Sequence, residues 1–169
     1  RLSAESYLVF VHRFKEWDKV KEDIFHGLKI YDLSASYEVG RSSRFIFGRK
    51  INPKFSNMGA VDGLQYELKI KSFYAGVIGG FRPDMGNYGF NSGLFQYGGY
   101  LYQEQRVKRG NMQNTLAFIE QSKDGKTDRR FAYFQHANSI IANLNFFGSA
   151  EFDLYNKVLN DEDSTYNQD

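Results

Sequence analysis

Apolar and polar side chains alternate along much of this chain with a period of two residues. The alternation is strictest over residues 31–39, 64–71 and 143–154. In the first stretch the apolar positions are Tyr31, Leu33, Ala35, Tyr37 and Val39. A period of two predicts β-strands with one apolar and one polar face. Less regular stretches over 2–14, 44–51, 73–81, 94–107, 112–121 and 130–137 bring the expectation to about eight or nine strands.

The segments between these stretches contain residues that end strands or form tight turns. Asp124-Gly125 predicts a two-residue hairpin, because a type I′ turn needs positive φ at both central positions. Pro53 and Pro83 donate no ladder hydrogen bond and so predict strand ends. We expect long loops at 52–62 and 83–92, short turns at 40–43, 71–73 and 123–127, and a loop or one short amphipathic helix at 17–27. Short turns alternating with long loops are typical of transmembrane barrels.

Composition strengthens this interpretation. The chain has 169 residues, 17% of them aromatic, yet its mean hydropathy is only −0.55. Alternating aromatic and polar positions explain both values. Glycines at 76, 79, 80, 98, 99 and 148 would weaken a small soluble sandwich, whereas a closed barrel in lipid tolerates them. The prediction is therefore an all-β fold, an antiparallel transmembrane β-barrel or part of one, and the alternative is a soluble sandwich or lipocalin-like barrel that binds a ligand.

Charge and motif content exclude several classes of protein. The net charge is +2, which is too small for the basic face of a nucleic-acid binder. The chain contains no Cys, so disulfides and Cys-based zinc sites are excluded. It has neither a phosphate-binding loop nor the glycine pattern of a dinucleotide site. We expect no cofactor and no metal.

The predicted polar faces supply candidates for a barrel interior and its rims. The lumen-facing candidates are Glu67, Lys69, Lys71, Glu151 and Asp153. The rim and turn candidates are Arg49, Asn52, Pro53, Asp62, Gly63, Arg129 and Arg130. Buried charges need partners, so we interpret the arginines, Arg82 among them, chiefly as paired with Glu67, Glu120 or Glu151. Aromatic residues near predicted strand ends suit interfacial girdles: Tyr31, Tyr37, Phe73, Phe81, Tyr102 and Tyr155.

Catalytic chemistry has little support in the sequence. His12, His26 and His136 lie far apart and in no metalloprotease pattern. A hydrolase would pair His136 with Ser139, but residues three apart near a strand end face different directions. The acidic residues 161–163 lack the spaced ligands of a calcium loop, and a solvated loop is the better interpretation.

Two blocks of sequence resemble a family of outer-membrane β-barrel proteins of the Bacteroidota, mostly uncharacterised. The first is FGRKINPKFSNMGAVDGLQYE (residues 47–67), and the second is KTDRRFAYFQHANSIIANLNFFGSAEFDLY (residues 126–155). The resemblance extends over roughly residues 1–155 and implies a location and a fold, but no reaction. It also implies further strands, because the chain ends in Gln168-Asp169 rather than in the aromatic residue of a final outer-membrane strand. Residues 156–169 are expected to form an acidic, polar loop or tail.

These observations lead to an ordered set of functional hypotheses. The first is an integral protein of the outer membrane of a Gram-negative bacterium that is not an enzyme. It would be a structural or accessory subunit of a larger assembly, such as export or membrane-protein insertion machinery. Its partners would be outer-membrane lipid and other outer-membrane or periplasmic proteins, with no nucleic acid. The alternative is a porin-like channel with a charged lumen, and an outer-membrane hydrolase ranks below both.

Overall fold

The computed structural model describes residues 1–11, 17–22, 24, 27–84, 86, 88–108, 110–141 and 143–156. One helix and nine strands follow one another: β1 (Leu2–Phe10), α1 (Trp17–Glu22), β2 (Leu28–Val39), β3 (Ser43–Ile51), β4 (Ala60–Ile70), β5 (Phe73–Phe81), β6 (Leu94–Val107), β7 (Gly110–Lys123), β8 (Lys126–Asn138) and β9 (Phe146–Asn156). A short 3₁₀ turn, η2 (Ser56–Met58), lies between β3 and β4. No helix within these ranges is both long and apolar enough to cross a membrane.

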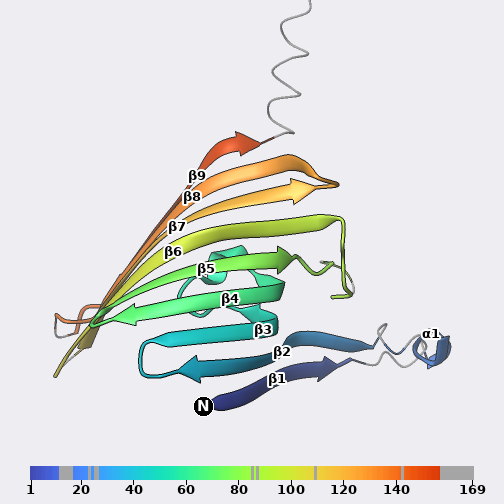
Figure 1. The fold of residues 1–169 in the computed structure, drawn as a ribbon, viewed down its shortest axis with the longest axis horizontal. Helices are drawn as coiled ribbons and strands as arrows, with labels where there is room; N and C mark the ends of the chain where they lie inside the picture. The colour runs from blue at the N-terminus through green and yellow to red at the C-terminus, as the bar shows by residue number, and fades with distance from the viewer. Residues whose placement is uncertain are drawn as a thin grey trace, which may run out of the picture.

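The strands form a single antiparallel meander in which each strand pairs with the next along the chain. The sequence-based prediction of an all-β, antiparallel fold is therefore confirmed. The predicted barrel closure is not seen, because β1 and β9 are the two edges of an open, curved sheet (Figure 1). Strong alternation made the strands predictable, whereas closure depends on pairing between the two edges, which no local pattern encodes.

The connections define two ends of the sheet. The short-turn end carries the reversals at 40–42 and 71–72, the turn between Val107 and Gly110, and residues 139–145. The long-loop end is where β1 connects to β2, β3 to β4 and β5 to β6, and it also carries the Asp124-Gly125 hairpin. The hairpin is as tight as expected, but it lies at the same end as the long loops. Short turns and long loops therefore do not alternate strictly along the chain. The positive φ of 50° at Asp124 and 77° at Gly125 explains the choice of residues.

Cross-strand register separates the side chains into two faces. One continuous row crosses the sheet through Tyr37, Phe45, Tyr66, Val77, Gly99, Phe118, Ala132 and Phe152. The next row, on the opposite face, runs through Glu38, Arg44, Glu67, Gly76, Tyr100, Ala117, Tyr133 and Glu151. We call the first side the outer face and the second the inner face. The hydrophobic core lies on the inner face, where Phe55 and Met58 of the β3–β4 connection pack against Ile119, Phe131 and other buried side chains.

Glycines let three neighbouring strands approach and bend together on the inner face. Gly48, Gly63 and Gly80 are direct cross-strand partners in β3, β4 and β5. A Cβ on Gly63 would lie 2.1 Å from the carbonyl oxygen of Gly79, so no larger residue fits without moving backbone. Asp62 and Gly63 were predicted among the rim and turn residues, but β4 begins at Ala60, so both lie within a strand and not in a turn. Glycine kinks of this kind introduce curvature into a sheet.

Candidate functional site

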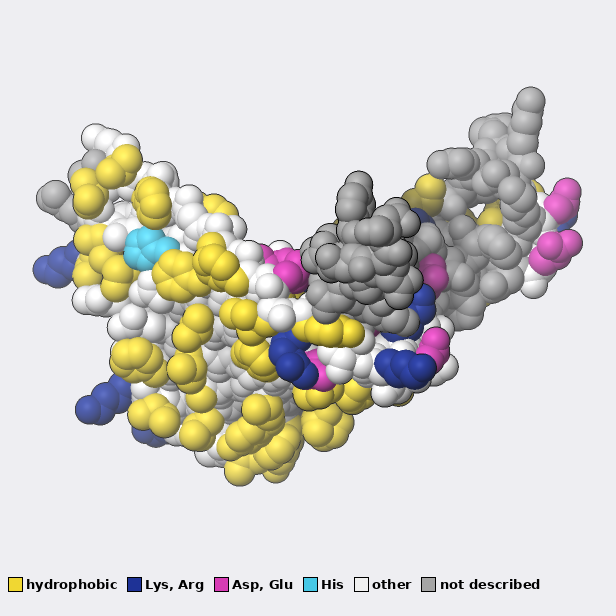
Figure 2. Space-filling view, turned by 90° about the horizontal axis from the view of Figure 1, so that it is seen from above, with side chains coloured by type: hydrophobic (Ala, Val, Ile, Leu, Met, Phe, Trp, Pro, Cys, Tyr) yellow, Lys and Arg dark blue, Asp and Glu magenta, His cyan; other side chains and the backbone are white. Residues whose placement is uncertain are grey.

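The outer face is apolar and exposed on every strand from β2 to β9. Its exposed side chains include Leu33, Tyr37, Phe47, Leu64, Phe73, Val77, Leu101, Leu116, Phe118, Phe134 and Phe152. Figure 2 shows hydrophobic side chains crowded along one side of the molecule, with charged side chains gathered elsewhere. A water-soluble monomer rarely exposes a contiguous apolar patch of more than a few hundred square ångströms, so a face of this extent indicates an interaction surface.

Polar pairs bound this apolar face. At the long-loop end Arg49 forms a two-pronged ion pair with Asp62, with 2.6 Å between Nη2 and Oδ2. The same guanidinium donates to the backbone carbonyls of Ile30 and Tyr88, so the β5–β6 connection covers the pair. On β7 and β8 the apolar band is narrowest, because the Arg130–Glu120 pair bounds it at that end. An arginine at such a border can extend its charged head away from an apolar medium.

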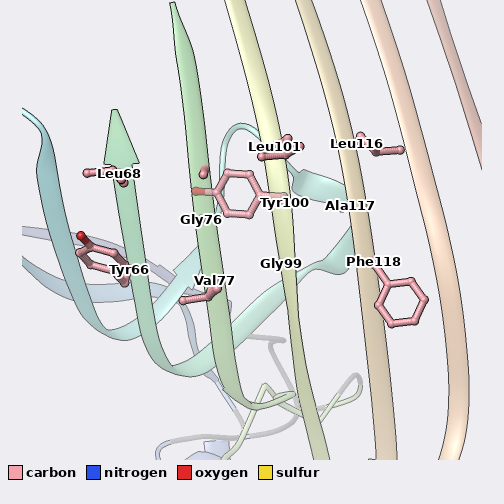
Figure 3. Close-up of a pocket in the computed structure, with 11 residues that line it drawn as sticks. Tyr66, Leu68, Gly76, Val77, Gly99, Tyr100, Leu101, Leu116, Ala117 and Phe118 are labelled. Carbon is pink, nitrogen blue, oxygen red and sulfur yellow. The ribbon is translucent and has the colours of Figure 1, made fainter. Parts of the chain in front are cut away.

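A shallow apolar cavity of about 490 Å³ lies in the middle of the outer face (Figure 3). Its floor is the backbone of Gly76 and Gly99, and its walls include Val77, Leu101 and Phe118. The floor is low because Gly99 lies in the outer row and has no side chain there. Gly76 belongs to the inner row, where the Tyr100 ring takes the place of its side chain and would lie 2.4 Å from a Cβ.

The β3–β4 connection, residues 52–59, folds across the inner face instead of extending from the rim. Phe55 is fully buried, with its ring centroid 5.1 Å from that of Tyr133 on β8. The Oγ1 of Thr115 on β7 donates to the backbone carbonyl of Lys54 at 2.8 Å. The Asn57 side chain reaches Glu151 on β9. One connection therefore covers the sheet from β4 to β9, and we call it the inner loop.

A buried polar network fixes the root of the inner loop. Asn52, a predicted rim residue, is buried and donates to Gln65 at 3.1 Å and to the Tyr100 hydroxyl at 2.9 Å. Tyr100 donates in turn to Glu67 at 2.7 Å. The Lys54 ammonium pairs with the same Glu67 carboxylate and lies 4.1 Å from the centroid of the Tyr74 ring. Glu67 is only 7% exposed, so its negative charge depends on these donors.

Two further charge clusters lie on the inner face. Lys50 binds Glu5 at 2.6 Å and Asp32 at 2.7 Å, which links β1, β2 and β3. At the other edge of the sheet, Arg129 pairs with both Glu151 and Asp153. The predicted lumen residues Glu151 and Asp153 thus share one arginine.

Arg82 lies just beyond β5, where its guanidinium is 3.5 Å from the side-chain oxygen of Gln121. Burial, together with the cation of nearby Arg129, lowers the pKa of Arg82. Arg82 was expected to pair with a carboxylate, but it donates to the side-chain amide of Gln121.

The remaining predicted residues are placed less centrally. Lys69 is exposed on the inner face near Tyr74, and Lys71 lies beyond β4 in the β4–β5 turn with a φ of 58°. Pro53 is exposed at the start of the inner loop. The aromatic Tyr102 is buried on the inner face, so its assignment to an interfacial girdle is wrong. The sequence-based prediction did not include Lys54, Phe55 or Met58. The two apolar residues, Phe55 and Met58, inside a predicted loop were a signal that the loop packs against the sheet.

The hydrolase candidates lie apart from each other. His136 contacts Asn114 through Nδ1 at 2.6 Å, and Ser139 bonds to Asn111. No hydrogen bond between His136 and Ser139 is present in the described part of the chain. Within the same residues no three His, Asp or Glu side chains gather in a way that could hold a metal ion. His12, His26 and residues 161–163 lie outside the described residues.

Comparison of the chain with protein-family models, with curated proteins and with solved structures finds no match. The functional argument therefore depends on the chemistry of the two faces alone.

The inner loop supplies much of the buried core, so its anchor should control stability. Phe55→Ala removes a fully buried ring, and we expect a loss of about 3–5 kcal/mol in the free energy of unfolding. The matched control is Phe147→Ala, because Phe147 is 65% exposed and should cost less than about 1 kcal/mol. Denaturant unfolding followed by circular dichroism measures both. Equal losses in the two variants would mean that the inner loop does not anchor the fold.

Proposed function

We propose that this sheet forms part of the wall of an outer-membrane β-barrel, with its outer face against lipid and its inner face toward the barrel interior. The observation that carries the proposal is the inverted distribution of polarity. Exposed leucine, valine, phenylalanine and tyrosine side chains cover the outer face, while Lys50, Glu67 and Asn52 are buried on the inner face. Apolar side chains outside and polar ones inside, alternating along each strand, are the pattern of transmembrane barrels.

The free energy of hydration supports this arrangement. Transfer of apolar surface out of water is worth about 25 cal/mol per Å², so each half-exposed large side chain forgoes roughly 1 kcal/mol in water. The outer face carries many such side chains, so a medium that covers the whole face would gain a large favourable free energy. Lipid acyl chains would cover the whole face at once and would also fill the cavity over Gly76 and Gly99.

A membrane location sets a requirement on the sheet edges. In hydrocarbon every backbone N–H and C=O must be paired, because each unpaired group costs several kcal/mol. The outer edges of β1 and β9 have no partner strand within the described residues. The proposed wall therefore pairs these two edges in the membrane, either with each other or with further strands.

The inner face favours a supporting role over conduction. In front of the core its buried charges are paired, as in Lys54–Glu67, Lys50–Asp32 and Arg129–Asp153. The inner loop occupies the space in front of β4 to β9. A conducting pore instead needs charged rings that face a water-filled path. We therefore place the chain as a structural or accessory subunit of a larger outer-membrane assembly, with the connections of the long-loop end as its contact surface.

A charge placed on the outer face distinguishes lipid from water as its medium. We expect Val77→Lys to lower the free energy of unfolding in lipid vesicles by about 2–4 kcal/mol, or to block insertion. Gln113→Lys adds the same charge to the inner face at a side chain with no hydrogen bond within the described residues, and we expect a change of about 0.5 kcal/mol or less. Denaturant titration of the vesicle-folded protein measures both. A Val77→Lys variant that folds in water as well as its parent would point to a water-exposed outer face.

The assembly role has a separate test. We expect native mass spectrometry of protein extracted in mild detergent to give a complex heavier than the denatured chain, with a fixed ratio of bound partners. The partners should dissociate when residues 82–93 are replaced by a short hairpin turn, because that connection belongs to the proposed contact surface. A single chain of unchanged mass under the gentlest extraction would count against the subunit role while leaving the membrane wall intact.

A further inference from the structure

The short-turn end of the inner face contains two adjoining cavities of about 430 Å³ each. Both are lined by Lys69 and Tyr74, so they form one continuous recess beside the inner loop. Six cationic and three anionic side chains line them. A recess of this size is large enough for a small organic ligand.

Ion pairs neutralise only part of this charge. Lys54 is bound to Glu67, and Arg106 is bound to Glu104 at 2.7 Å. Within the described residues Glu38 is then the one lining carboxylate outside an ion pair, and the remaining lining cations outnumber it. The surplus is positive even though the chain as a whole carries a formal charge of only +2.

Four lining cations lie outside these two ion pairs, and we call them the basic vestibule: Arg41, Arg44, Lys69 and Lys71. Among the described residues, Lys69 has the Tyr74 ring 5.3 Å from its ammonium but no carboxylate partner. Arg44 reaches Glu5 only at 3.5 Å and uses the same Nη2 to bind Ser36. Its Nε is buried and has no hydrogen-bond partner within the described residues. A buried donor without an acceptor is rare and indicates a missing acceptor.

We propose that the basic vestibule binds a small phosphate-bearing solute. Guanidinium and ammonium groups are the usual phosphate donors, and here two of each line one recess. The hydroxyls of Ser42 and Ser72 add neutral donors to the same lining. The recess lies on the inner face, away from the apolar outer face, so a free solute fits it better than the headgroup of a bilayer lipid. This proposal goes beyond the membrane role and does not require it.

Calorimetric titration of the detergent-solubilised protein with inorganic pyrophosphate tests the site. We expect saturable binding that weakens tenfold or more in the double variant Lys69→Gln/Lys71→Gln. Both side chains are exposed, so the fold should not change. The matched control is Lys123→Gln/Lys126→Gln, which removes the same charge from the hairpin at the opposite end and should bind as the parent does. Arg44→Gln is a third variant and should weaken binding through loss of the unpartnered Nε.

Three outcomes would overturn the proposal. The first is an absence of heat and saturation with pyrophosphate in the parent protein. The second is an equal loss in both double variants, because it would show general charge attraction rather than a site. The third is displacement of pyrophosphate by micelles containing phosphatidate but not by soluble glycerol phosphate, because it would place a lipid headgroup in the recess. None of these outcomes depends on whether Val77→Lys inserts into vesicles, so the two proposals fail separately.

Discussion

The buried carboxylate of Glu67 is the constraint on which the arrangement of the inner face depends. Its charge is stable at 7% exposure only because Tyr100 and Lys54 donate to it. Lys54 belongs to the inner loop, so satisfying Glu67 brings that loop across the sheet and seats Phe55 against Tyr133. The pairing of one charge thus organises both the hydrophobic core and the contents of the inner face.

Sheet curvature makes this arrangement possible. Gly48, Gly63 and Gly80 sit side by side on the inner face, and the Tyr100 ring occupies the space that a side chain at Gly76 would fill. The glycines that weaken a flat sheet here allow neighbouring backbones to approach closely and let an aromatic side chain lie flat. On the outer face the missing side chain of Gly99 leaves a shallow cavity that a deformable apolar medium would fill.

Much of the fold could be predicted from the sequence, because period-two alternation is a local property of each strand. β5 and β6 occur with the expected bounds, and the other strands differ at their ends by a few residues. The path of the inner loop could not be predicted in this way, because it depends on contacts between distant segments. Lys54 in the loop pairs with Glu67 on β4, and Thr115 on β7 donates to the Lys54 carbonyl. The predicted strand extended one residue too far, to Lys71, because the alternation of apolar and polar residues continues into the β4–β5 turn. The arginines were expected to pair with Glu67, Glu120 or Glu151 without specific assignment; Arg129–Glu151 and Arg130–Glu120 do pair across neighbouring strands, whereas Arg49 pairs with Asp62.

The central claim is that the two faces of this sheet meet different media. Because the chain has no Cys, single cysteines can be introduced one at a time along β7 and spin-labelled in the vesicle-reconstituted protein. Collision rates with dissolved oxygen, which concentrates in lipid, should then be high at Leu116 and Phe118 and low at Thr115 and Ala117. A water-soluble nickel chelate should not reach the two outer positions. Outer positions that collide with the chelate as freely as an exposed turn residue would contradict the account.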